Sequence, residues 1–481
     1  MSSVVAALLR AAGPWPDARS RAAAAGAIAT FARATPELPR TGERGQIARA
    51  VEARLAELSA RIETQLRVIF AAPELRRLEA SWRGLEYLVS RAAPSGGAVR
   101  VQAMAVTADE LLRDAQRART YPEQFGFRAL HEQAFGTLGG TPFGAVVLDH
   151  AFDASGRSIE LLDKLGASLS PAGTVLLTGA APGMFQAAGF VELRERRDLA
   201  LVFESTEYAK WRALRHSSGR LSSAAPLFLC APRVLLRAPA RTGDAPDAPT
   251  LDDGAWGNAA YAVAGALIDD YAATGWFYPL AADTPRIPDG LPERRTEDEF
   301  ENTTFTPIEV VLSARHRAQL AEAGFTVLAP PADDTERVTA QALSALKPRL
   351  VLDDRAMTVA LPHALPPRAL RRVIAIGRLR QLVGRILLTH TFDTVDEVQR
   401  YLDGWIAPHV AATPHDDAPF LSVRLTVGRP PMTWWYFHGV KNGLVSVGGF
   451  DVLVEAEVRD PAAASTSTPS TASTRGPGRR S

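Results

Sequence analysis

The spacing of apolar residues changes along this chain from a helical period to a strand period. In the N-terminal part an apolar residue recurs every three or four positions, as along one face of a helix. The spacing averages about 3.67 residues, which favours a straight packed helix over a left-handed coiled coil. The residues of this stripe are Ile47, Val51, Leu55, Leu58, Ile62, Leu66 and Ile69. Near the C-terminus apolar residues instead alternate with polar ones, the pattern of a half-buried strand. These residues are Leu421, Val423, Leu425 and Val427.

A second helix is predicted to begin at Pro73, because proline and then Glu74 suit a first helical turn. Apolar residues at helical spacing line one face of this helix, and the segment from Pro94 to Gly97 ends it. The residues of that face are Leu75, Leu78, Trp82, Leu85 and Val89. The sequence therefore predicts two successive amphipathic helices before the first strand.

The middle of the chain reads as alternating helices and strands. Residues 145–148 and 174–177 are short apolar runs on either side of a helical pattern at 158–169. This order predicts a parallel βαβ unit whose strands are buried on both faces. Further helices are expected at 198–215, 261–271, 313–323, 368–390 and after Thr394, and further strands at 308–312 and 325–328.

Composition shifts divide the chain into four parts. Prolines at 362, 366 and 367 mark the main boundary. We predict an N-terminal arm at 1–41, a mixed region at 42–361, a C-terminal domain at 366–460 and a disordered tail at 461–481. The fold class is mixed α/β and α+β. The C-terminal domain is expected to end in an antiparallel β-meander of strands 419–427, 432–440 and 447–458. Its last strand carries Phe450, Val452, Val454, Ala456 and Val458 in alternation.

Composition excludes several classes of protein. Lys and Arg number 54 against 53 Asp and Glu, so the chain lacks the basic excess of a general nucleic-acid binder. One cysteine, Cys230, excludes an internal disulfide framework, and its apolar surroundings predict a buried inert thiol. The apolar stretches are broken well before the roughly 20 residues of a membrane span, and the N-terminus lacks the basic start of a signal peptide. We therefore expect a cytoplasmic protein.

The sequence contains no recognisable catalytic motif. None of its four lysines follows a glycine, which argues against a P-loop ATPase, and neither a dinucleotide-binding nor a nucleophile-elbow motif occurs. The nine histidines are scattered without metal-ligand spacing, so no metal or other cofactor is predicted. Asp149 and Asp153 follow a strand, where α/β enzymes place catalytic groups. Capping of a loop is the better interpretation of both, and an enzyme with a site near Asp149 stays the alternative.

Several collinear segments resemble the large sheath subunit of the bacterial type VI secretion system, the TssC or VipB family. The resemblance runs from about residue 45 to 460. The segments that carry it are Pro73–Val89, Arg197–Arg212, Pro232–Arg237, Trp256–Tyr261, Tyr271–Trp276 and Leu320–Phe325, followed by the terminal strands. The dense aromatic run at Trp434, Trp435 and Tyr436 is interpreted as core or interface packing.

The resemblance implies a structural subunit without a catalytic site. Such a subunit pairs with a small, TssB-like sheath subunit and with other copies of itself, and stacks as six-membered rings around an inner tube of Hcp hexamers. A baseplate and a sheath-disassembling AAA+ ATPase are further implied partners, and contraction would propel the tube and its effectors. A sheath from a related phage-tail-like particle is the second structural interpretation.

The resemblance also implies that the terminal strands join neighbouring subunits as a shared sheet, consistent with strand addition at open edges. Residues 1–41 are poor in β-branched residues, so we assign them neither an interlocking strand nor an ATPase-recognition helix. The expected inter-subunit residues are Leu421, Val423, Leu425, Val427, Trp434, Trp435, Tyr436, Phe450, Val452, Val454 and Val458.

Overall fold

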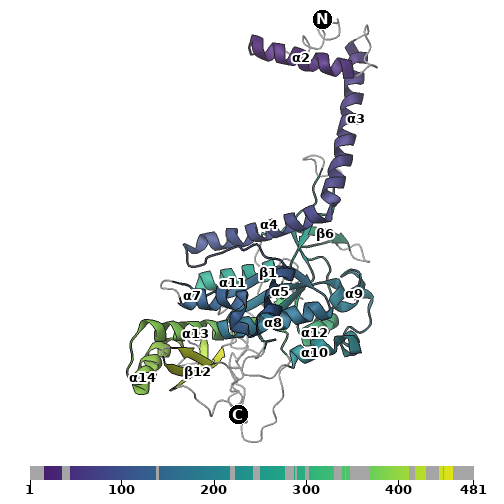
Figure 1. The fold of residues 1–481 in the computed structure, drawn as a ribbon. Coiled ribbons are helices and arrows are strands. Elements are labelled where there is room, and N and C mark those ends of the chain that lie inside the picture. The colour runs from purple at the N-terminus through teal and green to yellow at the C-terminus, as the bar shows by residue number, and fades with distance from the viewer. Residues whose placement is uncertain are drawn as a thin grey trace, which may run out of the picture. The chain divides into compact units, whose positions relative to one another are not determined.

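The computed structural model divides into two compact units (Figure 1). The first unit comprises Met1–Arg76 with Pro239–Asp253, and the second comprises Arg77–Ala238 with Gly254–Ser481. The structure describes residues 16–34, 44–136, 140–216, 223–241, 250–276, 287, 290–297, 303–329, 339–341, 343–346, 369–410, 418–429, 444–447 and 449–458. The predicted boundary at 362–367 and the tail at 461–481 lie outside these residues.

The first unit is helical in its described part. It contains α2 (Ala18–Ala34), α3 (Arg44–Ala71) and the start of α4 (Pro73–Ala92). Helix α3 confirms the long helix predicted from the apolar stripe. The stripe is not packed within the chain as predicted, because Leu55, Ile62 and Ile69 are each more than half exposed. Oε1 of Glu57 lies 2.6 Å from Nη2 of Arg61, one turn further along the helix. Exposed ion pairs at this spacing stabilise a solvated helix modestly.

A five-stranded sheet forms the centre of the second unit. Its strands are β1 (Ala145–Phe152), β2 (Val175–Ala180), β3 (Leu227–Ala231), β8 (Phe325–Ala329) and β9 (Thr339–Gln341), in that order. The first four strands are parallel, and β9 runs antiparallel to β8. Helix α8 (Gly156–Ala172) connects β1 to β2, which confirms the predicted parallel βαβ unit.

Two hydrophobic cores cover the two faces of this sheet. Neighbouring residues of a strand point to opposite faces, and in β3 Leu229 joins one core while Cys230 joins the other. The first core contains α8, α10 (Ala209–Arg215) and α12 (Ala314–Glu322), with Phe325 and Trp211 stacked at 5.4 Å between ring centroids. The second contains α4 and α11 (Ala260–Thr274). Burial on both faces explains why these strands are continuously apolar.

The remaining described elements are short. Thr107 and Glu110 form a capping box at the start of α5. The region 198–215 contains three short helical segments in place of one helix, η5, η6 and α10. The other elements are α5 (Ala108–Arg117), α6 (Phe125–Phe127), η3 (Arg128–Glu132), α7 (Gln133–Gly136), α9 (Glu192–Glu195), η1 (Ala93–Ser95), η2 (Tyr121–Glu123), η4 (Pro182–Phe185), η5 (Ala200–Glu204), η6 (Thr206–Tyr208), η7 (Ala407–His409), β4 (Val234–Arg237), β5 (Ala255–Gly257), β6 (Arg294–Glu297) and β7 (Thr303–Thr306).

The strand predicted at 308–312 is wrong. Ile308 forms a single antiparallel bridge with Val234, and no ladder continues from it among the described residues. The side chains nevertheless alternate, because Ile308 enters one core while Val310 and Leu312 enter the other. Two backbone hydrogen bonds flank this bridge, from Leu235 N–H to the Pro307 carbonyl at 2.7 Å and from Glu309 N–H to the Arg233 carbonyl at 2.9 Å. An extended segment that contributes to two cores thus has the sequence pattern of a strand without forming a continuous ladder.

The apolar face predicted for α4 does not form its buried face. The buried residues of this helix are Ala80, Gly84, Tyr87, Leu88 and Ala92. Trp82 on the predicted face is 64% exposed and Leu78 is 56% exposed. The reason lies in α11: a Cβ built at Gly84 would meet the ring of Tyr261, and one built at Gly265 would lie 2.6 Å from the ring of Tyr87. Small residues allow this close crossing, so they determine which face is buried.

Candidate inter-subunit interface

The C-terminal part of the second unit contains an antiparallel sheet of three strands. They are β10 (Phe420–Gly428), β11 (Leu444–Val447) and β12 (Phe450–Val458). The first and last confirm the strands predicted at 419–427 and 447–458. The sheet order is β10-β12-β11, so the last strand lies in the middle and the arrangement is not a simple meander. The strand predicted at 432–440, with Trp434, Trp435 and Tyr436, lies outside the described residues.

One face of this sheet is buried under two helices. Helices α13 (Leu370–Thr389) and α14 (Val395–Ile406) flank the strands, and Figure 1 shows them beside β12. Six of the eight predicted inter-subunit residues that the structure describes face this core and are buried within the chain. They are Leu425, Val427, Phe450, Val452, Val454 and Val458. Leu421 and Val423 are only half-buried. The alternation in the sequence therefore reports mainly packing within the subunit.

The opposite face of the sheet is more polar. Arg424 on β10 lies opposite Glu455 on β12 in the register, and Ser422 lies opposite Glu457. Burial lowers the pKa of the nearby Arg372 guanidinium, and the charge of Glu457 opposes that shift. Cross-strand pairs of opposite charge stabilise a sheet modestly and fix its register.

The sheet has two edge strands. Among the residues that the structure describes, β12 is paired on both sides, whereas β10 and β11 each form a ladder with β12 alone. Edge strands carry backbone groups that another chain can pair with, which makes them natural sites for strand addition. These two edges are thus the structural feature by which the sheet could extend into a neighbouring subunit.

Helix α13 contributes to two cores of the second unit, that of the five-stranded sheet and that of the C-terminal sheet. Leu370 and Ile374 lie in the core of the five-stranded sheet, while Leu379 and Val383 lie in the core of the C-terminal sheet. Polar contacts anchor the helix to the central sheet as well: Arg371 pairs with Asp270 at 2.9 Å. One helix therefore connects the C-terminal sheet to the larger core.

The side chain of Gln381 anchors the middle of α13. Its Nε2 donates to the carbonyl oxygen of Phe143, just before β1, at 2.8 Å and to that of Ala172, at the end of α8, at 3.0 Å. Buried backbone carbonyls need such donors, since an unpaired one is costly. The helix is held to the sheet by hydrogen bonds in addition to apolar packing.

Asp149 and Asp153 do not converge on a common site. Asp149 accepts a hydrogen bond from the Ser81 hydroxyl of α4. Asp153 accepts from the Ser155 N–H at 3.1 Å and from the hydroxyls of Ser155 and Ser158, at the start of α8. Burial would raise the pKa of Asp153, but these hydrogen bonds hold it below its ordinary value. Asp153 therefore agrees with the capping interpretation. That interpretation is wrong for Asp149, which lies within β1 and bonds to a helix distant in sequence.

The other chemical candidates are also structural in kind. Cys230 is buried in β3, and burial raises the pKa of its thiol well above the ordinary value, as expected for an unreactive cysteine. Among the residues that the structure describes, no group of three or more His, Cys, Asp or Glu side chains could hold a metal ion.

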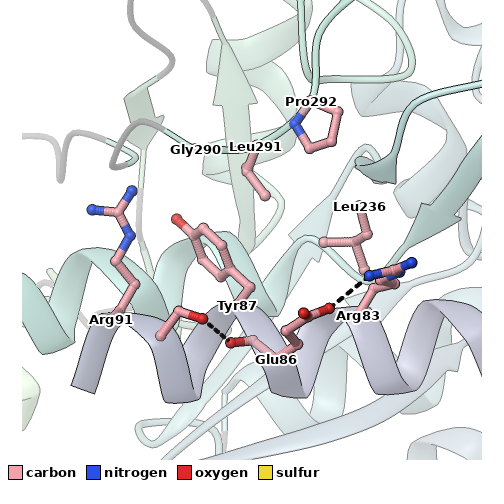
Figure 2. A pocket seen from close by; sticks show the side chains of 9 residues that line it. Arg83, Glu86, Tyr87, Arg91, Leu236, Gly290, Leu291 and Pro292 are labelled. Carbon is pink, nitrogen blue, oxygen red and sulfur yellow. Dashed lines mark hydrogen bonds and ion pairs between the residues drawn. The ribbon is translucent and has the colours of Figure 1, made fainter. Parts of the chain in front are cut away.

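A cavity of about 300 Å³ lies beside α4 (Figure 2). Figure 2 shows Arg83, Tyr87 and Arg91 along α4, with Leu291 and Pro292 across from them. Arg83 pairs with Glu86 at 2.8 Å, and Arg91 pairs with Asp269 at 3.3 Å. Both guanidinium groups of the lining thus have carboxylate partners, and the cavity has no surplus charge that would select an ionic ligand.

Comparison with known proteins identifies the family. The family model of VipB, described as EvpB/VC_A0108, tail sheath N-terminal domain, matches residues 52–345. The chain belongs to this family. The match covers α4, the five-stranded sheet and most of its two cores, and it confirms the resemblance to the large sheath subunit of the type VI secretion system.

A relative of known function agrees with the family match. The chain is 27% identical over 383 residues to the type VI secretion system sheath protein TssC1 of Pseudomonas aeruginosa, covering 76% of this chain and 75% of that protein. Among solved structures it is similar to the contracted helical sheath of the anti-feeding prophage, with 12% identity, a TM-score of 0.34, and coverage of 74% and 72% of the two chains. The protein is therefore a contractile sheath protein of the type VI and phage-tail kind. None of the helices in the described part of the chain is long and apolar enough to cross a membrane.

Proposed function

We propose that this chain is the large subunit of a type VI secretion sheath. In this function it pairs with a small, TssB-like subunit, and the pairs polymerise with further copies around an inner tube of Hcp hexamers. The observation that carries the proposal is the match of residues 52–345 to the tail sheath family, together with the relative named as a type VI sheath protein. The capping role of Asp153 supports the expectation that the chain is not an enzyme.

The proposed action is mechanical. Contraction of the sheath propels the tube and its effectors, from a baseplate at one end, and an AAA+ ATPase dismantles the contracted sheath in the cytoplasm. Subunits would turn as rigid bodies while strands shared between them keep the assembly connected. Two edge strands in the C-terminal sheet support this, because strand addition joins chains through backbone hydrogen bonds without a fixed angle between their cores.

The proposal is tested by negative-stain electron microscopy of this chain co-expressed with a small sheath-like subunit. Hollow tubules with six-fold cross-sections are the expected result. A partner-indifferent monomer would contradict the proposal. The chain expressed alone is the control, and it should give no tubules, because the proposed assembly needs both subunits.

A further inference from the structure

The side chain of Gln399 closes part of the outer edge of β10. Its Oε1 accepts a hydrogen bond from the Val427 N–H at 3.1 Å, and its Nε2 donates to the Leu425 carbonyl at 2.7 Å. A carboxamide offers one acceptor and donors, as a peptide group does. Leu425 and Val427 are two residues apart, so these groups lie on the same side of the strand, away from β12. Gln399 therefore occupies backbone groups that an added strand would use.

The position of Gln399 is fixed by α14. Its neighbour Val398 and the next-turn residue Leu402 are fully buried in the C-terminal core. Nε2 also donates to Asp403 at 2.8 Å, one turn further along the helix. The N-terminus of the helix is fixed by Thr394, whose hydroxyl accepts from the Glu397 N–H. The carboxamide is thus aimed at the strand edge by a well-anchored helix and a carboxylate.

The other end of the same edge is covered as well. Val410, just beyond α14, forms a parallel bridge with Phe420 at the start of β10. The nine-residue edge of β10 is therefore engaged at both ends by its own chain. Long open edges invite unwanted pairing, and proteins usually cover them. Here the edge is covered by the side chain of Gln399 and by the Val410–Phe420 bridge. Only these few hydrogen bonds would have to break to expose the edge.

We propose that Gln399 is a removable guard of the β10 edge, which an extended segment of a second copy of this chain displaces on assembly. This inference rests on the proposed function, because strand sharing is what requires the edge to open. Displacement exchanges two hydrogen bonds for two others, so its net cost is small. A second copy is the occupant because a sheath repeats one chain, and a strand edge that receives a segment from elsewhere on the next copy makes a head-to-tail contact that can propagate.

The test compares backbone exchange in variants before and after assembly. Hydrogen–deuterium exchange is measured on peptides that contain Leu425 to Val427, in the complex with the small subunit before polymerisation and in tubules. Gln399→Ala removes the guard. Arg400→Ala is the matched control, because that side chain is on the same helix and donates to the Asp396 carbonyl. Exchange of peptides from β1 and β2 reports whether each variant is folded.

Before polymerisation, Gln399→Ala should exchange roughly fivefold to tenfold faster in this peptide, while Arg400→Ala should match the wild type. In tubules both variants should be as protected as the wild type, because a neighbouring strand has taken the place of Gln399. A second variant, Asp403→Ala, releases Gln399 from its carboxylate and should give a smaller increase before assembly. It provides the same comparison if Gln399→Ala does not fold.

Two results would overturn the inference while leaving the proposed function intact. One is Gln399→Ala tubules in which the peptide still exchanges fast, because no strand then enters at β10. The other is a folded Gln399→Ala that cannot form tubules when the wild type does, because a removable guard is not needed in the assembled state. Absence of tubules from the wild type would instead remove the proposed function and this inference together.

Discussion

Gly377 in α13 lies directly against the backbone of Gly173, the residue that ends α8. A Cβ built at Gly173 would lie 2.8 Å from the Gly377 carbonyl oxygen, and one built at Gly377 would collide with the Gly173 carbonyl. Gly173 also has a φ of +67°, which favours glycine. The two glycines let α13 approach the central sheet closely enough for Gln381 to reach the carbonyls of Phe143 and Ala172.

We predict that Gly377→Ala lowers the free energy of unfolding by about 2 kcal/mol, because the added methyl overpacks a backbone contact that has no room for it. Thermal or urea unfolding of this chain, purified in complex with the small subunit, measures the change in the free energy of unfolding. Gly404→Ala in α14 is the matched control: nothing lies within 4 Å of its Cβ, so it should stabilise the helix by about 1 kcal/mol. Equal effects of the two substitutions would contradict the close contact.

Val423→Asp should abolish tubules while the central sheet stays folded. Val423 is half-buried at the margin of the C-terminal core, where an unpaired charge is costly. Ser422→Asp provides the control, since Ser422 is exposed on the other face of the same strand. Electron microscopy scores the tubules, and circular dichroism with limited proteolysis checks the fold. Normal tubules from Val423→Asp would count against a role of β10 in joining subunits.

The chain expressed alone should be poorly soluble, and the exposed face of α4 should contribute to this. Trp82 and Leu78 lie one turn apart, and both are more than half exposed. Exposed apolar patches promote association. Trp82→Gln should raise the soluble yield severalfold without changing the unfolding midpoint, which a thermal melt can check. A wild-type chain that is monodisperse without its partner would contradict this expectation.

Asp153→Ala should destabilise the protein by roughly 0.5–1 kcal/mol at neutral pH, because Ser155 and Ser158 lose their acceptor. The folded-state pKa of Asp153 lies below its ordinary value of 3.8. The stabilisation is therefore fully present above pH 4 and disappears as the pH falls through the lowered folded pKa. Unfolding midpoints of wild type and variant, measured between pH 7 and pH 3, should converge at the acidic end. A constant difference would show that the carboxylate is not the stabilising group.

The sequence predicted the elements whose pattern comes from local spacing along the chain. The stripe from Ile47 to Ile69 became α3, and the apolar runs around 145 and 174 became parallel strands. It also predicted Leu425 and Val427 to point inward, since a strand with one covered face alternates strictly. The family resemblance rested on such segments, and the comparisons support it.

The predictions that failed depended on neighbours distant in sequence. The buried face of α4 follows from Gly84 meeting Tyr261, and small residues contribute little to an apolar pattern. The strand order β10-β12-β11 depends on which edge β11 joins, which alternation does not encode. The contact of Gln399 with the edge of β10 could not have been predicted from the sequence, because nothing in the pattern of a polar helix residue indicates which strand its side chain reaches.

The sharing of α13 between two cores has a mechanical consequence. A helix that contributes side chains to the cores of two sheets cannot rotate against either sheet without disrupting a core. Torque applied at the C-terminal sheet is therefore transmitted to the central sheet with little loss. The flexibility that contraction requires must then lie in the contacts between chains. Each subunit would therefore move as one rigid body, and the contacts between subunits would rearrange.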